Sequence, residues 1–271
     1  NLAGNLSIAR LFKENRVSAV NFVNIFYSLG AFIGPALVGF LVSRIHTGNP
    51  VFWLGAVLIF IGGLLLLRIS PAGSEADEEV TSPPRGTLRV YAVPLLWVLG
   101  LLGLFYGGSE TGMSGWASTY LQLSVQFSVE RAAFITATFF LALTLGRMVC
   151  SWLGSRWTDL QILALTLCVT LLGSVLLVAG YRNPVMSVIA ILLVGLGYGG
   201  TYPTMIALAT SVFQQTSGKA VSLIVALGSI GGSLLPGLQG ILIERTGAFS
   251  TAIMIATLAF LMLLMTLIAR W

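Results

Sequence analysis

The sequence predicts an all-α membrane protein, a helical bundle that crosses the bilayer about eight times. Apolar residues make up 56% of the chain and charged residues only 8%, whereas a soluble domain needs about a quarter of its residues charged. The mean hydropathy is +0.95, so lipid must be the outer solvent. Apolar runs of the length that a spanning helix needs, roughly 20 residues, recur along the chain.

The spans follow from these runs in chain order. The runs that qualify are 17–45, 50–68, 90–123, 129–154, 158–180, 184–213, 218–244 and 249–270. Residues 1–12 are interpreted as the last turns of an earlier helix. Turn-forming Gly, Asn and Pro residues separate the spans at 47–50 and 181–184. Residues 69–89 combine Pro and Gly with a cluster of acidic side chains, so we expect a linker there.

The loops carry an uneven distribution of Lys and Arg. Successive spans cross the membrane in opposite directions, so the loops lie on alternate sides. One side then carries nine basic residues: Arg10, Lys13, Arg16, Arg68, Arg85, Arg89, Arg156, Lys219 and Arg270. The other side receives Arg44, Arg131, Arg182 and Arg245. Because positive loops stay inside, we expect the linker and the C-terminal end to be cytoplasmic and the protein to lie in the plasma (inner) membrane. These basic residues form no patch, so nucleic acid is not an expected partner.

An internal repeat organises the helices. Residues 12–44 align without gaps on residues 213–245, with ten identical positions that include matched Gly and Pro. An even number of spans separates the copies, so both cross in the same direction, as in transporters built from parallel repeats. With a repeat unit of six helices, the repeated helices are the fifth and the eleventh of twelve. The sequence then predicts the end of an N-terminal six-helix bundle at 1–68 (the tail of helix 4, helices 5 and 6), a cytoplasmic linker at 69–89 and a C-terminal six-helix bundle at 90–271.

Four segments carry Gly-rich motifs with aromatic residues or proline. They are 30–35, 104–110 with Trp116 and Tyr120, 145–147 with 151–153, and 195–203. The first resembles the fifth-helix motif of the major facilitator superfamily of secondary transporters. The others resemble the seventh, eighth and tenth helices of its fucose–galactose–glucose branch. The resemblance covers essentially the whole chain and implies helices 5–12 of a twelve-helix bundle, alternating access, a sugar-like solute and proton coupling. The loop at 154–159 is a degenerate form of that family's charged cytoplasmic motif.

Glu110 is the one acidic residue placed deep within a span. A carboxylate in hydrocarbon is costly, so it must face protein or a water-filled cavity. Burial favours its neutral form, which suits a site that binds and releases protons. Tyr106 and Ser114 lie one turn away on the same helix face. The alternative is a protonated Glu that serves only as a structural hydrogen-bond donor.

Arg147 is the one basic residue left inside a span, on a stripe with Thr144 and Ser151. It is a candidate to bind solute or to form a gating ion pair. A long side chain that reaches back to the headgroups is the alternative.

A second polar stripe lies on the fifth helix. Asn21, Asn24 and Ser28 follow an i, i+3, i+7 spacing and should face a partner helix or a cavity. Carboxamides and aromatic rings suit neutral sugars, and Tyr198, Tyr202 and Gln239 extend this set. The candidate solute-binding or coupling residues are therefore Glu110, Tyr106, Asn21, Asn24, Arg147, Tyr198, Tyr202 and Gln239. Trp116 and Tyr120 lie near a helix end and fit an interfacial aromatic belt.

Small residues and cysteines are interpreted structurally. The pairs Gly30/Gly34 and Gly228/Gly232 predict close helix packing. Cys150 and Cys168 lie within apolar runs, so we expect buried packing and no disulfide framework. The motif at 195–199 is not a nucleotide loop, because no strand precedes it and no lysine follows.

The sequence favours a secondary transporter of a small polar solute, coupled to protons and working as a monomer in the lipid bilayer. An exporter of drugs or metabolites and a non-transporting solute sensor remain open as alternatives. A phosphate-binding loop and a metal-ligand cluster are both absent from the sequence, so we expect no cofactor and no metal. Glu110 has no histidine or second carboxylate at membrane depth, so we expect no enzyme.

Overall fold

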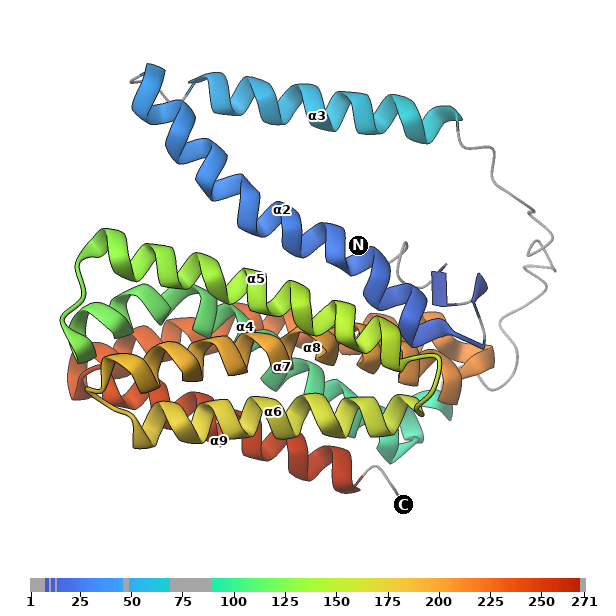
Figure 1. The fold of residues 1–271 in the computed structure, drawn as a ribbon. Coiled ribbons are helices and arrows are strands. Elements are labelled where there is room, and N and C mark those ends of the chain that lie inside the picture. The colour runs from blue at the N-terminus through green and yellow to red at the C-terminus, as the bar shows by residue number, and fades with distance from the viewer. Residues whose placement is uncertain (1–7, 10, 13, 46–48, 69–88, 269–271) are drawn as a thin grey trace. The chain divides into compact units, whose positions relative to one another are not determined.

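The computed structural model describes residues 8–9, 11–12, 14–45, 49–68 and 89–268. These residues form eight α-helices and two short 3₁₀ helices, and no strand occurs among them (Figure 1). In chain order they are α2 (Arg16–Ile45), α3 (Asn49–Arg68), η1 (Arg89–Ala92), α4 (Pro94–Val125), α5 (Val129–Leu153), α6 (Asp159–Ala179), α7 (Pro184–Val212), η2 (Gln214–Thr216), α8 (Ser217–Thr246) and α9 (Phe249–Ile268). The chain divides into two compact units, Gly30–Leu88 and the combination of Asn1–Leu29 with Arg89–Trp271.

The all-helical class predicted from hydropathy is confirmed, since each predicted span coincides with one α-helix. The largest difference is at residues 90–93, where a 3₁₀ turn precedes α4. Pro94 then opens the helix, because a proline nitrogen has no hydrogen to leave unpaired in the first turn. Among the described residues, five helices are long and apolar enough to cross a membrane, and α4 is not one of them. Glu110 and a run of Gly, Ser and Thr lower the hydropathy of α4.

Side-chain caps explain several of the helix starts. The hydroxyl of Thr158 accepts a hydrogen bond from the Gln161 amide, and the Gln161 side chain accepts one from the Thr158 amide in return. The Asn183 side chain accepts bonds from two amides of α7, whose first residue is Pro184. At the C-terminal end of α8, Gly247 adopts a φ of +83°, a backbone conformation that glycine reaches without strain.

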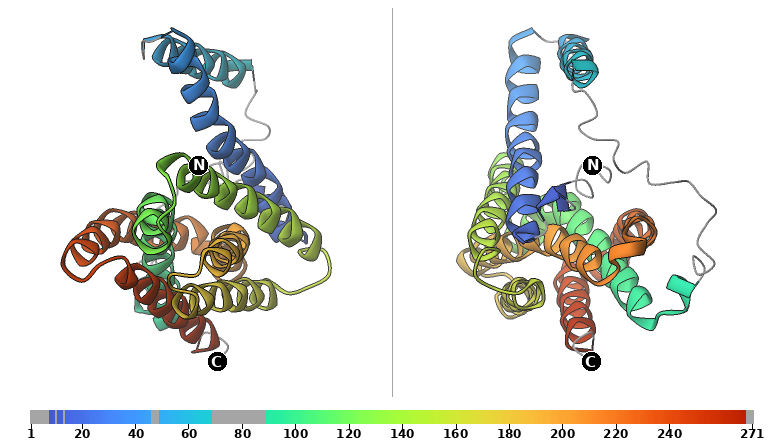
Figure 2. Two further views of the ribbon diagram at one scale, coloured as in Figure 1. Left: turned by 60° about the vertical axis from the view of Figure 1, so that its left-hand side comes forward. Right: turned by 90° about the vertical axis from the view of Figure 1, so that its right-hand side faces the viewer.

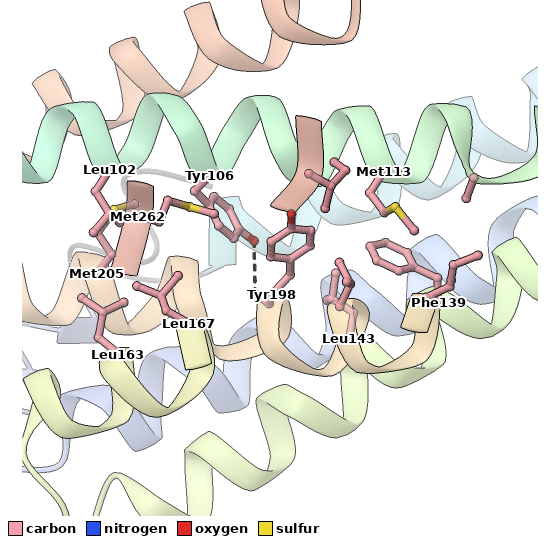
Figure 3. Packing of buried hydrophobic residues seen from close by; sticks show 14 of the residues in the cluster. Leu102, Tyr106, Met113, Phe139, Leu143, Leu163, Leu167, Tyr198, Met205 and Met262 are labelled. Atoms are coloured by element: carbon pink, nitrogen blue, oxygen red, sulfur yellow. Dashed lines mark hydrogen bonds between the residues drawn. The ribbon is translucent and has the colours of Figure 1, made fainter. Parts of the chain in front are cut away.

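The six helices α4–α9 form one bundle with a continuous apolar core (Figures 1 and 2). α4 packs along α8, α7 packs along both α5 and α6, and α9 covers α4 and α6. Figure 3 shows this core, in which aromatic rings from α4, α5 and α7 meet Leu and Met side chains. α7 therefore packs between α5 and α6, and it contributes Tyr202 and Met205 to the site described below.

The glycine run of α7 brings three helices into backbone contact. A Cβ added at Gly195 or Gly199 would collide with carbonyl oxygens of α5, those of Phe139 and Leu143. A Cβ at Gly197 would collide with Thr170 of α6 instead. The alternating glycines therefore press α7 against α5 on one face and α6 on the other. Tyr198, between these positions, is left to point toward α4 (Figure 3).

α4 and α8 cross through a second set of glycines. A Cβ at Gly231 would collide with the carbonyl oxygen of Leu104, and one at Gly107 with that of Gly228. The close approach predicted for the Gly228/Gly232 pair is therefore present. At Gly30, by contrast, no described atom lies within 4 Å of an added Cβ. The side chains around Gly34 lie outside the described residues.

The first half of α2 packs on α5 and α6 within the same compact unit. The hydroxyls of Ser18 and Ser151 each donate to the other residue's carbonyl oxygen. Gly154 makes this approach possible, because a Cβ there would reach the backbone of Ser18 within 3.1 Å. Arg16 Nε lies 3.7 Å from Asp159 Oδ2 at the start of α6.

The unit Gly30–Leu88 contains the rest of α2 and all of α3. α3 exposes large apolar side chains along its length, including Trp53, Ile59 and Phe60, as a helix in contact with lipid does. Residues 47 and 48 of the predicted turn lie outside the described residues, and residues 49 and 50 are the first two of α3. Of the predicted linker at 69–89, only Arg89 is described. The predicted boundaries between a first helical bundle, a linker and a second bundle therefore remain predictions.

Two expectations about individual residues are wrong. Tyr120 is fully buried and donates a hydrogen bond to the carbonyl oxygen of Leu177 at 3.2 Å, so it belongs to the core and not to an interfacial belt. Cys168 is exposed, although Cys150 is buried as expected, and both thiols are free. An apolar sequence pattern does not distinguish a side chain that faces lipid from one that faces protein.

Candidate functional site

A cavity of about 430 Å³ lies among α4, α5, α7, α8 and the first half of α2. Its residues from α4 and α8 include four glycines, whose missing side chains leave the space open. The lining residues are Asn24, Gly103, Tyr106, Gly107, Glu110, Thr111, Arg147, Tyr202, Met205, Ile224, Val225, Gly228, Ser229, Gly232 and Ser233. The cavity thus combines hydroxyl groups, two aromatic rings and a pair of opposite charges, and its size suits a small molecule.

Glu110 lies on the face of α4 that turns toward this cavity. It is half-buried, and its charge interacts with that of Arg147 on α5. One turn earlier on the same helix, Tyr106 lines the same cavity and interacts electrostatically with the Glu110 carboxylate. The Tyr106 hydroxyl donates to the carbonyl oxygen of Tyr198 at 3.3 Å (Figure 3). The Glu110 carboxyl group is therefore carried by α4, and it interacts with Tyr106 of α4 and Arg147 of α5.

Arg147 is 2% exposed and points into the protein. Its Nε donates to the carbonyl oxygen of Gly199 at 3.2 Å, and its NH1 group donates to that of Asn24. The absence of side chains at Gly146 and Gly199 lets α5 and α7 come close enough for these bonds. This is not the geometry of a side chain that reaches for lipid headgroups.

Three tyrosines form a connected group beside the charges. The rings of Tyr106 and Tyr202 stack with centroids 5.9 Å apart and planes 24° apart. Tyr198 meets Tyr106 edge-on at 5.7 Å, and its hydroxyl is hydrogen-bonded to Ser109. Tyr198 is fully buried and does not line the cavity itself. It supports Tyr106, which does.

The cavity brings together five of the eight predicted site residues: Glu110, Tyr106, Asn24, Arg147 and Tyr202. Asn21, Tyr198 and Gln239 are buried outside its lining. The Asn21 amide donates to Val17, while its carbonyl oxygen has no described partner. Neither amide atom of Gln239 has a hydrogen-bond partner among the described residues, and its Oε1 lies against Gly112 of α4. Ser28, on the predicted stripe of α2, lies outside the side chains described.

Thr111, Ser229 and Ser233 also line the cavity, although none of them was among the site residues predicted from the sequence. Ser229 and Ser233 directly follow Gly228 and Gly232 on α8 and are exposed. The sequence did contain a signal for these two serines, because the pair Gly-Ser occurs twice on α8, four residues apart. Such serines satisfy their hydroxyls on their own helix, as both do here with bonds of 2.9 Å.

The Ser109–Tyr198 hydrogen bond should be measurable as a coupling energy. Tyr198→Phe leaves the buried Ser109 hydroxyl without this partner, and Ser109→Ala leaves the tyrosine hydroxyl without it. Each single change should destabilise the fold by about 1 kcal/mol, and the double variant by no more than either single one. Thermal unfolding of the purified protein in detergent tests this. Additive effects of the two changes would contradict the coupling.

The fold and the site together define a multi-pass helical membrane protein with a charged, polar cavity among its helices. The family model of the major facilitator superfamily matches the chain over residues 1–236 and 99–271. The chain therefore belongs to the major facilitator superfamily. This is a family of membrane transporters and not of enzymes, as the sequence analysis expected.

Curated relatives are distant and longer than this chain. The glucose/mannose transporter GlcP of Bacillus subtilis (strain 168) is 22% identical over 236 residues, which are 84% of this chain and 58% of that protein. A TsgA homolog of Serratia proteamaculans (strain 568) is 24% identical over 245 residues, covering 87% of this chain and 59% of the relative. The chain thus spans about three-fifths of the length of these relatives.

Solved structures show the same fold. The fucose:proton symporter FucP of E. coli, in a variant form, superimposes with a TM-score of 0.80 at 17% identity. FucP in its outward conformation gives a TM-score of 0.80 at 18% identity, and the match covers 99% of this chain and 72% of that one. The resemblance predicted from the Gly-rich motifs is confirmed at the level of the superfamily and the fold.

Proposed function

We propose that the protein is a secondary active transporter that moves a small polar solute, a sugar or sugar-like compound, with protons. The observation that carries this proposal is the cavity in which Glu110 and Arg147 face stacked tyrosine rings and several hydroxyl groups. An ionisable carboxyl at membrane depth marks an ion or proton pathway in membrane proteins. The names of two relatives, a glucose/mannose transporter and a fucose:proton symporter, support the choice of solute.

In this proposal the protein works by alternating access. Residues 1–68 and 90–271 belong to two helical halves that rock about a site at the membrane midplane, joined by the cytoplasmic linker 69–89. The C-terminal end lies in the cytoplasm of a plasma (inner) membrane, and one protein molecule suffices for transport. Solute loads at the cavity from one side and leaves from the other.

The decisive experiment uses the intact protein in liposomes with a pH gradient. We expect inward accumulation of at least one member of a panel of labelled monosaccharides and sugar acids when the outside is acidic, and loss of accumulation with a protonophore. A solute that binds but never crosses would identify a sensor. Efflux of lipophilic compounds in exchange for protons would identify an exporter.

A further inference from the structure

Two serines of α8, Ser229 and Ser233, line the cavity and are exposed in the part of the chain that the structure describes. Each directly follows a glycine that also lines the cavity, Gly228 or Gly232. The serines lie one helical turn apart, so their Cβ atoms are about 5–6 Å from each other on one helix face. The α8 wall therefore presents two hydroxyl groups at a fixed spacing to a molecule in the cavity.

The hydrogen atom of each of these hydroxyl groups is already used. Ser229 donates to the carbonyl oxygen of Val225, and Ser233 donates to that of Ser229, both at 2.9 Å. A serine hydroxyl has one hydrogen to donate and two lone pairs that accept hydrogen bonds. Because both side chains are exposed and line the cavity, their oxygens meet a bound molecule as acceptors.

The rest of the α8 wall adds no donor to this pair. The other α8 residues in the lining have no polar side chain; they are Ile224, Val225, Gly228 and Gly232. All of them lie within the α-helix Ser217–Thr246, in which backbone amides donate to carbonyl oxygens of the same helix. Among the described residues, this wall of the cavity thus offers hydrogen-bond acceptors only.

We propose that Ser229 and Ser233 determine specificity by accepting hydrogen bonds from two hydroxyl groups of the solute. This rests on the proposed function, transport of a sugar or sugar-like compound. Hydroxyl groups on opposite sides of a six-membered sugar ring are separated by about the length of one helical turn, so one ring bridges both serines. A carboxylate has no hydrogen to give these oxygens, so an anionic group of a solute faces another wall.

The glycines beside the serines let a ring come close to the helix. A Cβ at Gly228 would lie 3.3 Å from the carbonyl oxygen of Gly103, and one at Gly232 would lie 3.2 Å from the Thr111 hydroxyl oxygen. A methyl group at either position would therefore fill space between α8 and α4 that the cavity now occupies.

Other helices supply the apolar contacts that a sugar ring needs. The stacked rings of Tyr106 on α4 and Tyr202 on α7 line the same cavity. A sugar presents apolar C–H groups on the faces of its ring and hydroxyl groups around its edge. The ring faces therefore suit the tyrosines, and the edge suits the serine oxygens of α8.

The test uses analogues of one sugar and liposomes that contain the intact protein and a pH gradient. The probe is D-glucose, or the compound of the panel that is accumulated most if glucose is not. A deoxy analogue lacks one hydroxyl group, and a deoxyfluoro analogue carries a fluorine that cannot donate a hydrogen bond. At two ring positions we expect both analogues to lower kcat/KM for uptake about fivefold, the effect of one neutral hydrogen bond.

Serine variants assign the two positions. Ser229→Ala should lower kcat/KM for the parent sugar about fivefold and make uptake insensitive to the loss of one of the two hydroxyl groups. Ser233→Ala should do the same for the other hydroxyl group. Ser222→Ala is the matched control, because Ser222 is exposed on α8 two turns earlier and lies outside the cavity lining. It should keep the wild-type pattern.

Two outcomes would overturn the inference. One is uptake of the deoxyfluoro analogues as fast as that of the parent sugar at every ring position. The other is a serine variant that changes uptake of the parent and of all analogues by the same factor, as a purely structural role predicts. Either would leave the proposed function standing. Failure to accumulate every monosaccharide and sugar acid of the panel would remove the proposed function and the inference together.

Discussion

Glu110→Gln should convert accumulation of the solute into simple equilibration. Glutamine keeps the shape and polarity of the protonated carboxyl group but releases no proton, so the return of the empty carrier is no longer linked to proton release. One pH unit corresponds to 1.36 kcal/mol, or tenfold, for each proton carried. Wild-type protein should therefore approach about tenfold accumulation across one pH unit, and the variant should stop at equal concentrations on both sides.

The control for this change is Glu244→Gln on the exposed end of α8, which removes a carboxylate outside the cavity. It should accumulate solute as the wild type does. Exchange of labelled for unlabelled solute, measured without a pH gradient, should persist in Glu110→Gln, because exchange needs no proton release. Full accumulation by Glu110→Gln would show that the proton travels through another group.

Gly231→Ala should destabilise the protein more than any other single methyl addition on α8. The added carbon would overlap the carbonyl oxygen of Leu104 and also meet its Cα at 3.0 Å, and both are backbone atoms that only a shift of α4 can move. Overpacking of this kind costs about 1–3 kcal/mol. At roughly 2–4 °C for each kcal/mol, the unfolding temperature should fall by several degrees.

Gly237→Ala provides the matched control on the same helix. No atom of the described part of the chain lies within 4 Å of a Cβ added there, so the change should raise stability by about 0.5–1 kcal/mol through the better helix propensity of alanine. Scanning fluorimetry of both purified variants makes the comparison. Equal melting temperatures for the two would mean that α4 and α8 separate without cost. Because Gly231 adjoins the cavity lining, solute binding by the Gly231 variant should weaken in parallel.

Much of the fold was predictable because lipid imposes a simple rule on sequence. A spanning segment must satisfy its own backbone hydrogen bonds, so long apolar runs are helices and the breaks between them carry turn residues. The starts of α5 and α7 were placed at the observed residue. The start of α4 was placed four residues early, because Val90 and its neighbours are apolar but form a 3₁₀ turn.

The site was predictable where a residue was out of place in hydrocarbon, and less so where it was not. Glu110 and Arg147 are charged within apolar runs, and the structure brings both to one cavity. Gln239 is also a polar residue within an apolar run, yet it is buried against Gly112 of α4 instead of lining the cavity. The sequence of a helix does not show which neighbouring helix a given side chain will meet. Tyr198 was named for solute contact, but it lies behind Tyr106.

The alternating glycines of α7 also bear on how this sequence can change over time. Gly195 and Gly199 touch the backbone of α5, and Gly197 touches α6, so a larger residue at any of them displaces a neighbouring helix. A change there is tolerated only together with a compensating change in the partner helix, and such paired substitutions arise rarely. Lipid-facing residues such as Leu172 have no such partner. Among homologues, the glycine run should therefore drift slowly while the outer face of the bundle varies almost freely.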